Sequence, residues 1–371
     1  LIFGAAVFCW RRGFRPARFY VLASVCSTAG VIVRILNSLD VTRLDLDIAE
    51  FGPDTAGFIV FFALLSFALS DRINILKKEK ETAQEKAMAE LETRVKERTT
   101  EVVKQKHIIE EKHKEITDSI NYAERIQRSF IATETLLASN LNSYFVVFKP
   151  KDVVSGDFYW GGTLANGDFA LVTGDSTGHG VPGAIMSLLN ITSIEKAVEL
   201  ETDPAQILNQ TRYTIIERLK KDGSVEGGKD GMDCSLLCFD FHNMLLKIAA
   251  ANLPVLVVRN VVNGNETGKE LFEIKPDKMP VGKHDKDHQS FLTKTFQLQP
   301  NDMLYTFTDG FPDQFGEKTG KKFMVKKLKE LLVSHSHLPV EEQKKVFSET
   351  FKIWTGELEQ TDDVTLIGIR V

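Results

Sequence analysis

Four aspartates, far apart in the chain, each stand at the end of an apolar run, beside a glycine or a second aspartate. They are Asp157, Asp175, Asp309 and Asp362. At such positions a strand passes into a loop, so several strands can deliver carboxylates to one place. Mg²⁺ and Mn²⁺ prefer oxygen ligands, and two such ions about 4 Å apart can clamp a phosphoryl group and activate a water molecule. We therefore predict that these residues gather two divalent cations, Mn²⁺ or Mg²⁺.

The glycines beside these aspartates serve the same chemistry. Residues 174–180 read GDSTGHG, and Gly156 and Gly310 adjoin Asp157 and Asp309. Glycine lets the backbone turn sharply beside an ion and leaves room for a bulky phosphate. A single Asp-Gly pair more often marks a turn than a ligand, so the prediction depends on the four segments together.

Composition divides the 371-residue chain into three parts. Residues 1–70 are apolar, residues 71–130 are charged and contain neither Gly nor Pro, and residues 131–371 have a globular pattern. A net charge of -5 gives no support for a nucleic-acid partner, which would need a clustered basic face. Four cysteines are too few for a disulfide scaffold in a chain of this size.

The apolar part predicts membrane-spanning helices. Residues 19–36 and 56–70 are each long enough to cross a bilayer, the second with help from residues toward 51, and residues 1–10 resemble the end of a further span. The abrupt apolar start leads us to expect more spans before residue 1. Basic residues crowd the first loop and acidic residues the second, so the first loop is expected inside and the C-terminal part in the cytoplasm. These features predict a multi-pass protein of the inner (plasma) membrane; a soluble bundle of apolar helices is the alternative.

Residues 71–130 predict one long helix. Apolar residues recur every seventh position, although the companion seam position is mostly polar. A coiled-coil seam that is only half apolar favours a parallel homodimer of moderate stability that is able to change register. The alternative is that this helix is an inert spacer. The recurring residues are Met88, Val95, Val102, Ile109, Ile116 and Ala123.

The globular part predicts clustered strands and paired helices, which favour an α+β fold with antiparallel sheets covered by helices. A hairpin turn is expected at Asn166-Gly167, and a helix cap at Asp203 before Pro204. A glycine-rich loop, residues 223–231, precedes the later strands. The expected strands are residues 144–148, 157–160, 169–173, 234–241, 245–251, 255–259, 271–274, 291–298, 303–308 and 364–370, and the expected helices are residues 183–200, 204–220, 322–333 and 340–354.

Taken in order, these segments resemble the metal-dependent protein phosphatases (the PPM superfamily), in the branch named for stage II sporulation protein E. The resemblance runs from about residue 119 to residue 371. The spans at the N-terminus resemble the end of the seven-transmembrane-helix sensors with diverse intracellular signalling modules. The motifs that carry the phosphatase resemblance are DSTGHG at 175–180, DGMD at 230–233, KPDKMPVG at 275–282, YTFTDG at 305–310 and DQFG at 313–316.

The resemblance implies a PPM-type α-β-β-α sandwich and a phosphoserine or phosphothreonine phosphatase without a covalent enzyme intermediate. It implies three parts: a transmembrane part (1–70), a signalling helix (71–130) and a phosphatase domain (131–371). Phosphorylated anti-sigma-factor antagonists are the expected type of substrate. The implied metal ligands are Asp157, Asp175, the carbonyl of Ser176, Asp309 and Asp362, with Asp233 and Asp313 as supporting groups or ligands of a third ion.

Some residues depart from the family pattern or remain open. His179 lies four residues after Asp175, and a role in stabilising the turn is favoured over that of general acid. No arginine matches the phosphate-binding one of eukaryotic relatives, which leaves Lys149 and Lys151 as alternatives that are more simply exposed lysines. Two other functions compete with the phosphatase: a degenerate, non-catalytic receptor that signals by contact, and a sensor histidine kinase, for which no nucleotide-binding motif is found.

Overall fold

The computed structural model describes residues 1–39, 41, 53–220, 229–263 and 266–371. Within them the chain forms two compact units, Leu1–Glu110 and Glu111–Val371. Helix α3 (Pro53–Phe130) ends the first unit and begins the second. The described residues leave out nearly all of the acidic loop between the two predicted spans. They also leave out residues 221–228 of the glycine-rich loop.

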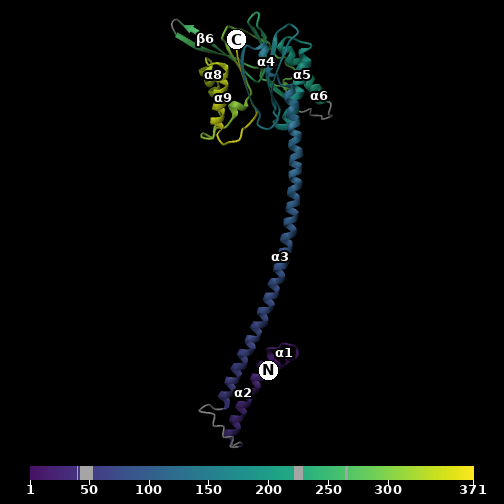
Figure 1. Cartoon of the computed structure of the whole chain (residues 1–371), viewed down its shortest axis with the longest axis vertical. Helices are drawn as coiled ribbons and strands as arrows, with labels where there is room; N and C mark the ends of the chain where they lie inside the picture. Colours follow the sequence, from purple (N-terminus) through teal and green to yellow (C-terminus); the bar gives the residue numbers. More distant parts are fainter. Residues whose placement is uncertain (40, 42–52, 221–228, 264–265) are drawn as a thin grey trace. The chain divides into compact units, whose positions relative to one another are not determined.

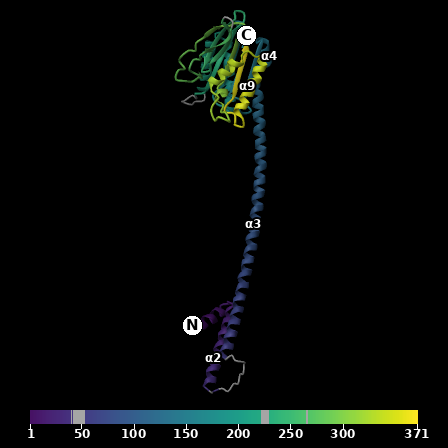
Figure 2. The ribbon, with the colours of Figure 1, turned by 90° about the vertical axis from the view of Figure 1, so that its left-hand side faces the viewer.

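The first unit contains helices that match the predicted spans. Two of its helices are long and apolar enough to cross a bilayer, with mean hydropathies of 1.9 and 1.8 over their most apolar windows. The first of these, α2 (Ala17–Ser38), packs beside the first part of α3 (Figures 1 and 2), where the rings of Tyr20 and Phe61 lie 6.0 Å apart and Arg34 forms an ion pair with Asp54. The helices before α3 are α1 (Ile2–Arg11) and α2 (Ala17–Ser38).

The predicted helix 71–130 is continuous with the second span inside α3. Its recurring apolar side chains are exposed in the single chain: Val95, Val102 and Ile109 keep 56%, 60% and 67% of their surface accessible. An exposed apolar stripe on a charged helix leaves a surface that a second helix could cover. The dimer itself stays a prediction.

The second unit holds two antiparallel sheets. The first sheet has five strands in the order β1-β11-β10-β6-β7, and the second has six, with the path β2-β3-β4-β5-β9 and β8 paired with β4. The first sheet comprises β1 (Ser143–Lys149), β11 (Val364–Arg370), β10 (Met303–Phe307), β6 (Val255–Asn263) and β7 (Glu266–Ile274). The second comprises β2 (Asp157–Thr163), β3 (Phe169–Ser176), β4 (Gly231–Asp240), β5 (Leu245–Ala251), β9 (Lys294–Gln297) and β8 (Val281–Gly282).

The two sheets stack face to face, and pairs of helices cover their outer faces (Figure 1). Alternation along the strands explains the layers: Leu304 packs between the sheets, whereas Met303 and Tyr305 face the outer helices. This is the predicted α-β-β-α sandwich, and the α+β class is confirmed. The helices α5 (Gly180–Val198) and α6 (Pro204–Leu219) cover the second sheet, and α8 (Val325–His335) and α9 (Val340–Thr355) cover the first.

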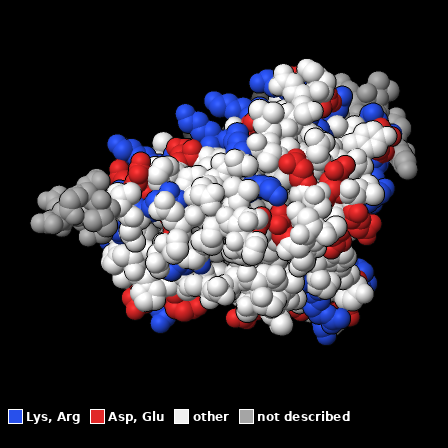
Figure 3. Space-filling model, turned by 90° about the horizontal axis from the view of Figure 1, so that it is seen from above, with Lys and Arg blue, Asp and Glu red and all other residues white. Residues whose placement is uncertain are grey.

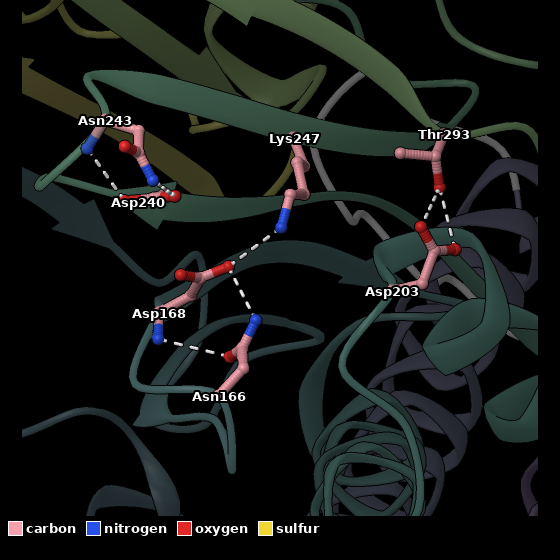
Figure 4. A network of polar contacts seen from close by, with 7 residues as sticks. All are labelled: Asn166, Asp168, Asp203, Asp240, Asn243, Lys247 and Thr293. Carbon is pink, nitrogen blue, oxygen red and sulfur yellow. Dashed lines mark hydrogen bonds and ion pairs between the residues drawn. The ribbon is translucent and has the colours of Figure 1, made fainter.

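Two local predictions are confirmed at the polar network in Figure 4. Gly167 has a φ of 89° in the β2–β3 turn, and Asn166 donates to Asp168, which also pairs with Lys247. The carboxylate of Asp203 caps α6 by accepting from two backbone N–H groups, and the Thr293 hydroxyl donates to it as well. The turn and the cap therefore follow from residue types alone.

Other boundaries differ from the predictions for physical reasons. Helix α5 begins at Gly180, because Pro182 is tolerated in a first turn, where its missing N–H is not needed. Strand β9 is shorter than residues 291–298, since the backbone N–H of Phe291 donates to the side chain of Asn209 instead of to a strand. Helix α8 begins at Val325, after Met324 takes a φ of 74°. Three short elements were not predicted: α4 (Glu134–Asn140), α7 (Gly310–Asp313) and β8.

Candidate metal and active site

Three aspartates lie side by side across the second sheet. Asp157 on β2 is the register partner of Asp175 on β3, and Asp175 is the register partner of Asp233 on β4. Like charges at directly opposed positions destabilise an antiparallel pair. Three in a row are an arrangement that folding alone does not favour, which marks this sheet end as functional.

The first sheet reaches the same place. Thr308, just after β10, and Thr365 on β11 both donate their hydroxyls to one carboxylate oxygen of Asp157, over 2.6 and 2.7 Å. Asp309 follows Thr308 at the start of α7, and Asp362 stands two residues before β11. The site therefore lies at one end of the sandwich, with both sheets contributing.

A sixth aspartate, Asp363, organises the loop that leads into β2. It is buried, with 2% of its surface exposed, and it accepts from the backbone N–H groups of Lys151 and Gly156, each over 2.7 Å. Asp363 is not among the residues predicted from the sequence to form the site. Its position directly after a predicted ligand could have suggested a role, because a buried carboxylate needs partners.

Close backbone contacts at the glycines shape the site. A Cβ on Gly156 would lie 2.3 Å from the carbonyl oxygen of Gly178 and 3.2 Å from that of Ser176. A Cβ on Gly310 would lie 1.9 Å from the carbonyl oxygen of Asp363. No side chain fits at either position, so the predicted need for glycine beside the aspartates has a direct steric cause.

Burial and mutual repulsion raise the pKa values of these carboxyl groups. Desolvation raises the pKa of Asp157 and of Asp175 well above the ordinary value, and neighbouring aspartates raise both further. The pKa of Asp309 is raised to about 6, first by partial desolvation and then by the negative charges of Asp362, Asp313 and Asp233. A cation at this place would offset the repulsion.

The supporting aspartates have partners of their own. The side-chain amide of Asn252 donates to Asp233 over 2.8 Å, and Asp313 pairs with Lys322 at 2.7 Å. Asp362 accepts from the backbone N–H of Asp363. In the described ranges, no three His, Cys, Asp or Glu side chains stand close enough together to hold a metal ion. The aspartates thus gather at one end of the sandwich without forming a closed ligand shell.

His179 and Lys149, whose roles the sequence does not decide, lie at the margin of the site. His179 Nδ1 lies 3.3 Å from a carboxylate oxygen of Asp152, and both side chains are exposed. Lys149 turns toward α9, with its ammonium nitrogen 4.9 Å from the centre of the Phe351 ring. Because this contact directs the Lys149 ammonium group toward an apolar surface, Lys149 is not favoured as a phosphate ligand.

Gln127, near the end of α3, connects this helix to the site. Its side-chain amide donates to the carbonyl of Ser155 (2.5 Å) and the hydroxyl of Ser187 (2.8 Å), and it accepts from the N–H of Ser155. Ser155 precedes Gly156 and Asp157, so one buried side chain fixes the entry to β2. Gln127 lies within the predicted helix 71–130, but its contact with Ser155, 28 positions further along the chain, does not follow from the helical pattern.

Replacing Gln127 by Ala is expected to destabilise the protein by about 2 kcal/mol, because two buried backbone groups of Ser155 lose their partner. Activity should fall roughly 10-fold to 100-fold, as for groups that orient metal-binding residues. Urea unfolding and hydrolysis rates measure both effects. Gln105→Ala, at an exposed position of the same helix, is the control, and equal behaviour of the two variants would contradict this role.

The pH dependence of stability should report the raised pKa of Asp309. With metal chelated, the folded state holds this proton more tightly than the unfolded state, so the carboxyl group lowers stability as pH rises from about 4 through 6. Asp309→Asn should therefore be more stable than the native chain at pH 7 and nearly equal to it at pH 4. Thermal unfolding in EDTA tests this, and a difference independent of pH would contradict it.

Comparison with known protein families identifies the class of protein. Residues 165–371 match the family described as Stage II sporulation protein E (SpoIIE), and residues 1–72 match the one described as 7TM diverse intracellular signalling. The C-terminal unit thus has a PP2C-type phosphatase fold preceded by a membrane-sensor segment. Because the first match covers more than half of the chain, the chain belongs to the SpoIIE family, which confirms the resemblance.

A solved phosphatase domain supports this fold. The PP2C domain of SiaA from Pseudomonas aeruginosa is 29% identical, with a TM-score of 0.60 over 70% of this chain and 98% of that one. The PP2C phosphatase domain of SpoIIE from Bacillus subtilis, with a regulatory fragment, is 18% identical, with a TM-score of 0.48 over 62% of each chain. No curated protein matches the sequence.

Proposed function

We propose that the chain is a membrane-anchored protein serine/threonine phosphatase. The carrying observation is that Asp157, Asp175 and Asp233 stand in register on three strands, while Thr308 and Thr365 of the other sheet hold Asp157. Family membership supports a phosphatase, and the raised pKa values of the buried aspartates support a cationic cofactor.

The donor set fits Mn²⁺ or Mg²⁺, because it consists of carboxylate and carbonyl oxygens with glycines that leave space beside them. Asp157, Asp175, the Ser176 carbonyl, Asp309 and Asp362 would hold two ions, with Asp233 and Asp313 in support. When bound, the ions would supply Lewis-acid activation of water and charge neutralisation of the phosphoryl group. Asp363 and Gln127 fix the loop before Asp157, and the threonine hydroxyls orient its carboxylate.

The proposed organisation follows the three parts of the sequence: transmembrane residues 1–70, a signalling helix at 71–130 and a cytoplasmic phosphatase domain at 131–371. The match of residues 1–72 and the two apolar helices support the membrane part. A phosphorylated anti-sigma-factor antagonist is the proposed type of substrate. On the face shown in Figure 3, acidic and basic side chains are interspersed, which favours a protein partner over nucleic acid.

Hydrolysis of p-nitrophenyl phosphate by the full chain in detergent tests the proposal. Activity with Mn²⁺ or Mg²⁺ that disappears with EDTA and returns on adding metal is expected, followed by release of phosphate from a phosphoserine peptide. The non-catalytic receptor predicts no hydrolysis with any divalent ion. Hydrolysis that persists in EDTA would refute the metal-dependent mechanism.

The proposed parallel dimer through residues 71–130 predicts a position-dependent cross-link. Val102→Cys, on the exposed apolar stripe, should form an intermolecular disulfide under mild oxidation of the full chain, because seam positions face each other in a parallel coiled coil. Thr100→Cys, on the opposite face, is the control and should cross-link much less. Equal cross-linking of both variants would contradict the seam.

A further inference from the structure

A groove on the second unit has no place in the proposed catalytic site. It has a volume of about 610 Å³ and lies between α8 and α9. Phe323, Leu331 and Trp354 supply apolar lining, and Ile353 at its edge has 72% of its surface exposed. A hollow of this size accommodates one or two large apolar side chains.

The rim of the groove is basic, although the chain as a whole carries a net charge of -5. Lys318 and Lys327 line the groove, and Lys326, next to Lys327 on α8, is exposed. The ammonium groups of Lys318 and Lys326 have no ion-pair partner among the residues that the structure describes. The ammonium nitrogen of Lys327 lies 3.8 Å from the centre of the Trp354 ring. Glu330 is the acidic residue that lines the groove. An acidic partner therefore complements this rim better than a basic one.

The groove adjoins the segment that carries the aspartates of the site. Trp354 donates its ring N–H to the carbonyl of Gln314 over 2.9 Å, and the Gln314 side chain accepts from the N–H of Thr361, next to Asp362. Gln314 also directly follows Asp313 in the chain. One residue thus joins the aromatic wall of the groove to two loops of the catalytic end.

We propose that this groove docks an acidic, leucine-bearing segment of the phosphoprotein substrate. The inference rests on the proposed phosphatase function. An apolar side chain packs in the hollow against Leu331 and Ile353, beside the contacting rings of Phe323 and Trp354. Flanking carboxylates approach Lys318 and Lys326. Because Trp354 in the groove wall is hydrogen-bonded to Gln314, which follows Asp313 and also binds the backbone of Thr361, a docked segment holds the phosphorylated residue near the aspartates and raises its local concentration.

Two measurements on the full chain test the docking site. The first is fluorescence anisotropy with a labelled phosphoserine peptide that carries glutamates and leucines, compared with peptides in which lysine replaces glutamate or serine replaces leucine. The second is hydrolysis of that peptide and of p-nitrophenyl phosphate. The test variant is Lys318→Glu with Lys326→Glu, and the control is Lys345→Glu with Lys352→Glu, which changes the same charge on exposed positions of α9 outside the groove.

The test variant should bind the acidic peptide about tenfold more weakly, a change of about 1.4 kcal/mol, and raise its KM with kcat and p-nitrophenyl phosphate hydrolysis unchanged. The control should match the native chain. Equal binding by both variants, or no preference for the acidic leucine peptide, would overturn the inference. So would loss of self-association in the test variant with peptide binding unchanged, which would assign the groove to a second copy. Absent hydrolysis with intact docking would count against the proposed function alone.

Discussion

Asp175→Asn is expected to lower kcat toward p-nitrophenyl phosphate at least ~10³-fold, in the range found when a member of a catalytic unit is removed. Asp175 stands between Asp157 and Asp233 in the strand register and has the largest set of acidic neighbours acting on its pKa. An amide keeps the shape of the side chain but removes the charge that a divalent ion requires.

The same substitution should stabilise the metal-free protein, because it removes a desolvated charge that repels its neighbours. Thermal unfolding with EDTA and with Mn²⁺ separates the two effects. The native chain should gain stability on adding Mn²⁺, and Asp175→Asn should gain less. Asp118→Asn, at an exposed position of α3, is the control. A variant that is less stable without metal and equally stabilised by it would contradict the assignment.

Gly310→Ala should have the largest effect on folding. The added Cβ would lie 1.9 Å from the carbonyl oxygen of Asp363, which belongs to backbone and cannot rotate away. We expect a loss of about 3 kcal/mol, the upper end for overpacking. Activity should fall ~10²-fold even where the protein stays folded, because Asp309 and Asp362 adjoin the two colliding residues.

Gly268→Ala is the matched control for this substitution. Its Cβ would meet nothing closer than 3.7 Å, so its stability should stay within about 0.5 kcal/mol of the native chain. Urea unfolding compares the two variants. A Gly310→Ala protein as stable and active as Gly268→Ala would show that the contact between α7 and the loop before β11 is not rigid.

Local chemistry in the sequence predicted much of the fold. Asp203 with Pro204 marks the start of α6, and residues 364–370 match β11, because caps and apolar runs act within a few residues. Helix α4 and strand β8 were missed, since a seven-residue helix and a two-residue strand carry too little periodicity to detect.

The aspartates of the site could be predicted from the sequence, but the strand pairing and hydrogen bonds that position them could not. Asp157 and Asp175 could be chosen by residue type and adjacent glycines. Their register with Asp233 depends on pairing between distant strands, which local patterns do not encode. Likewise, nothing in the sequence around Gln127 indicates that its amide reaches Ser155, 28 positions further along the chain.

Counting bound Mn²⁺ tests the central claim most directly. Isothermal titration calorimetry of the full chain in detergent should give two Mn²⁺ per chain at neutral pH, and weaker binding at pH 5, where protons compete for the carboxylates. Asp175→Asn should lose at least one ion, and Asp118→Asn none. Absence of saturable binding by the native chain, or an unchanged stoichiometry and affinity in Asp175→Asn, would contradict a two-metal site built on these aspartates.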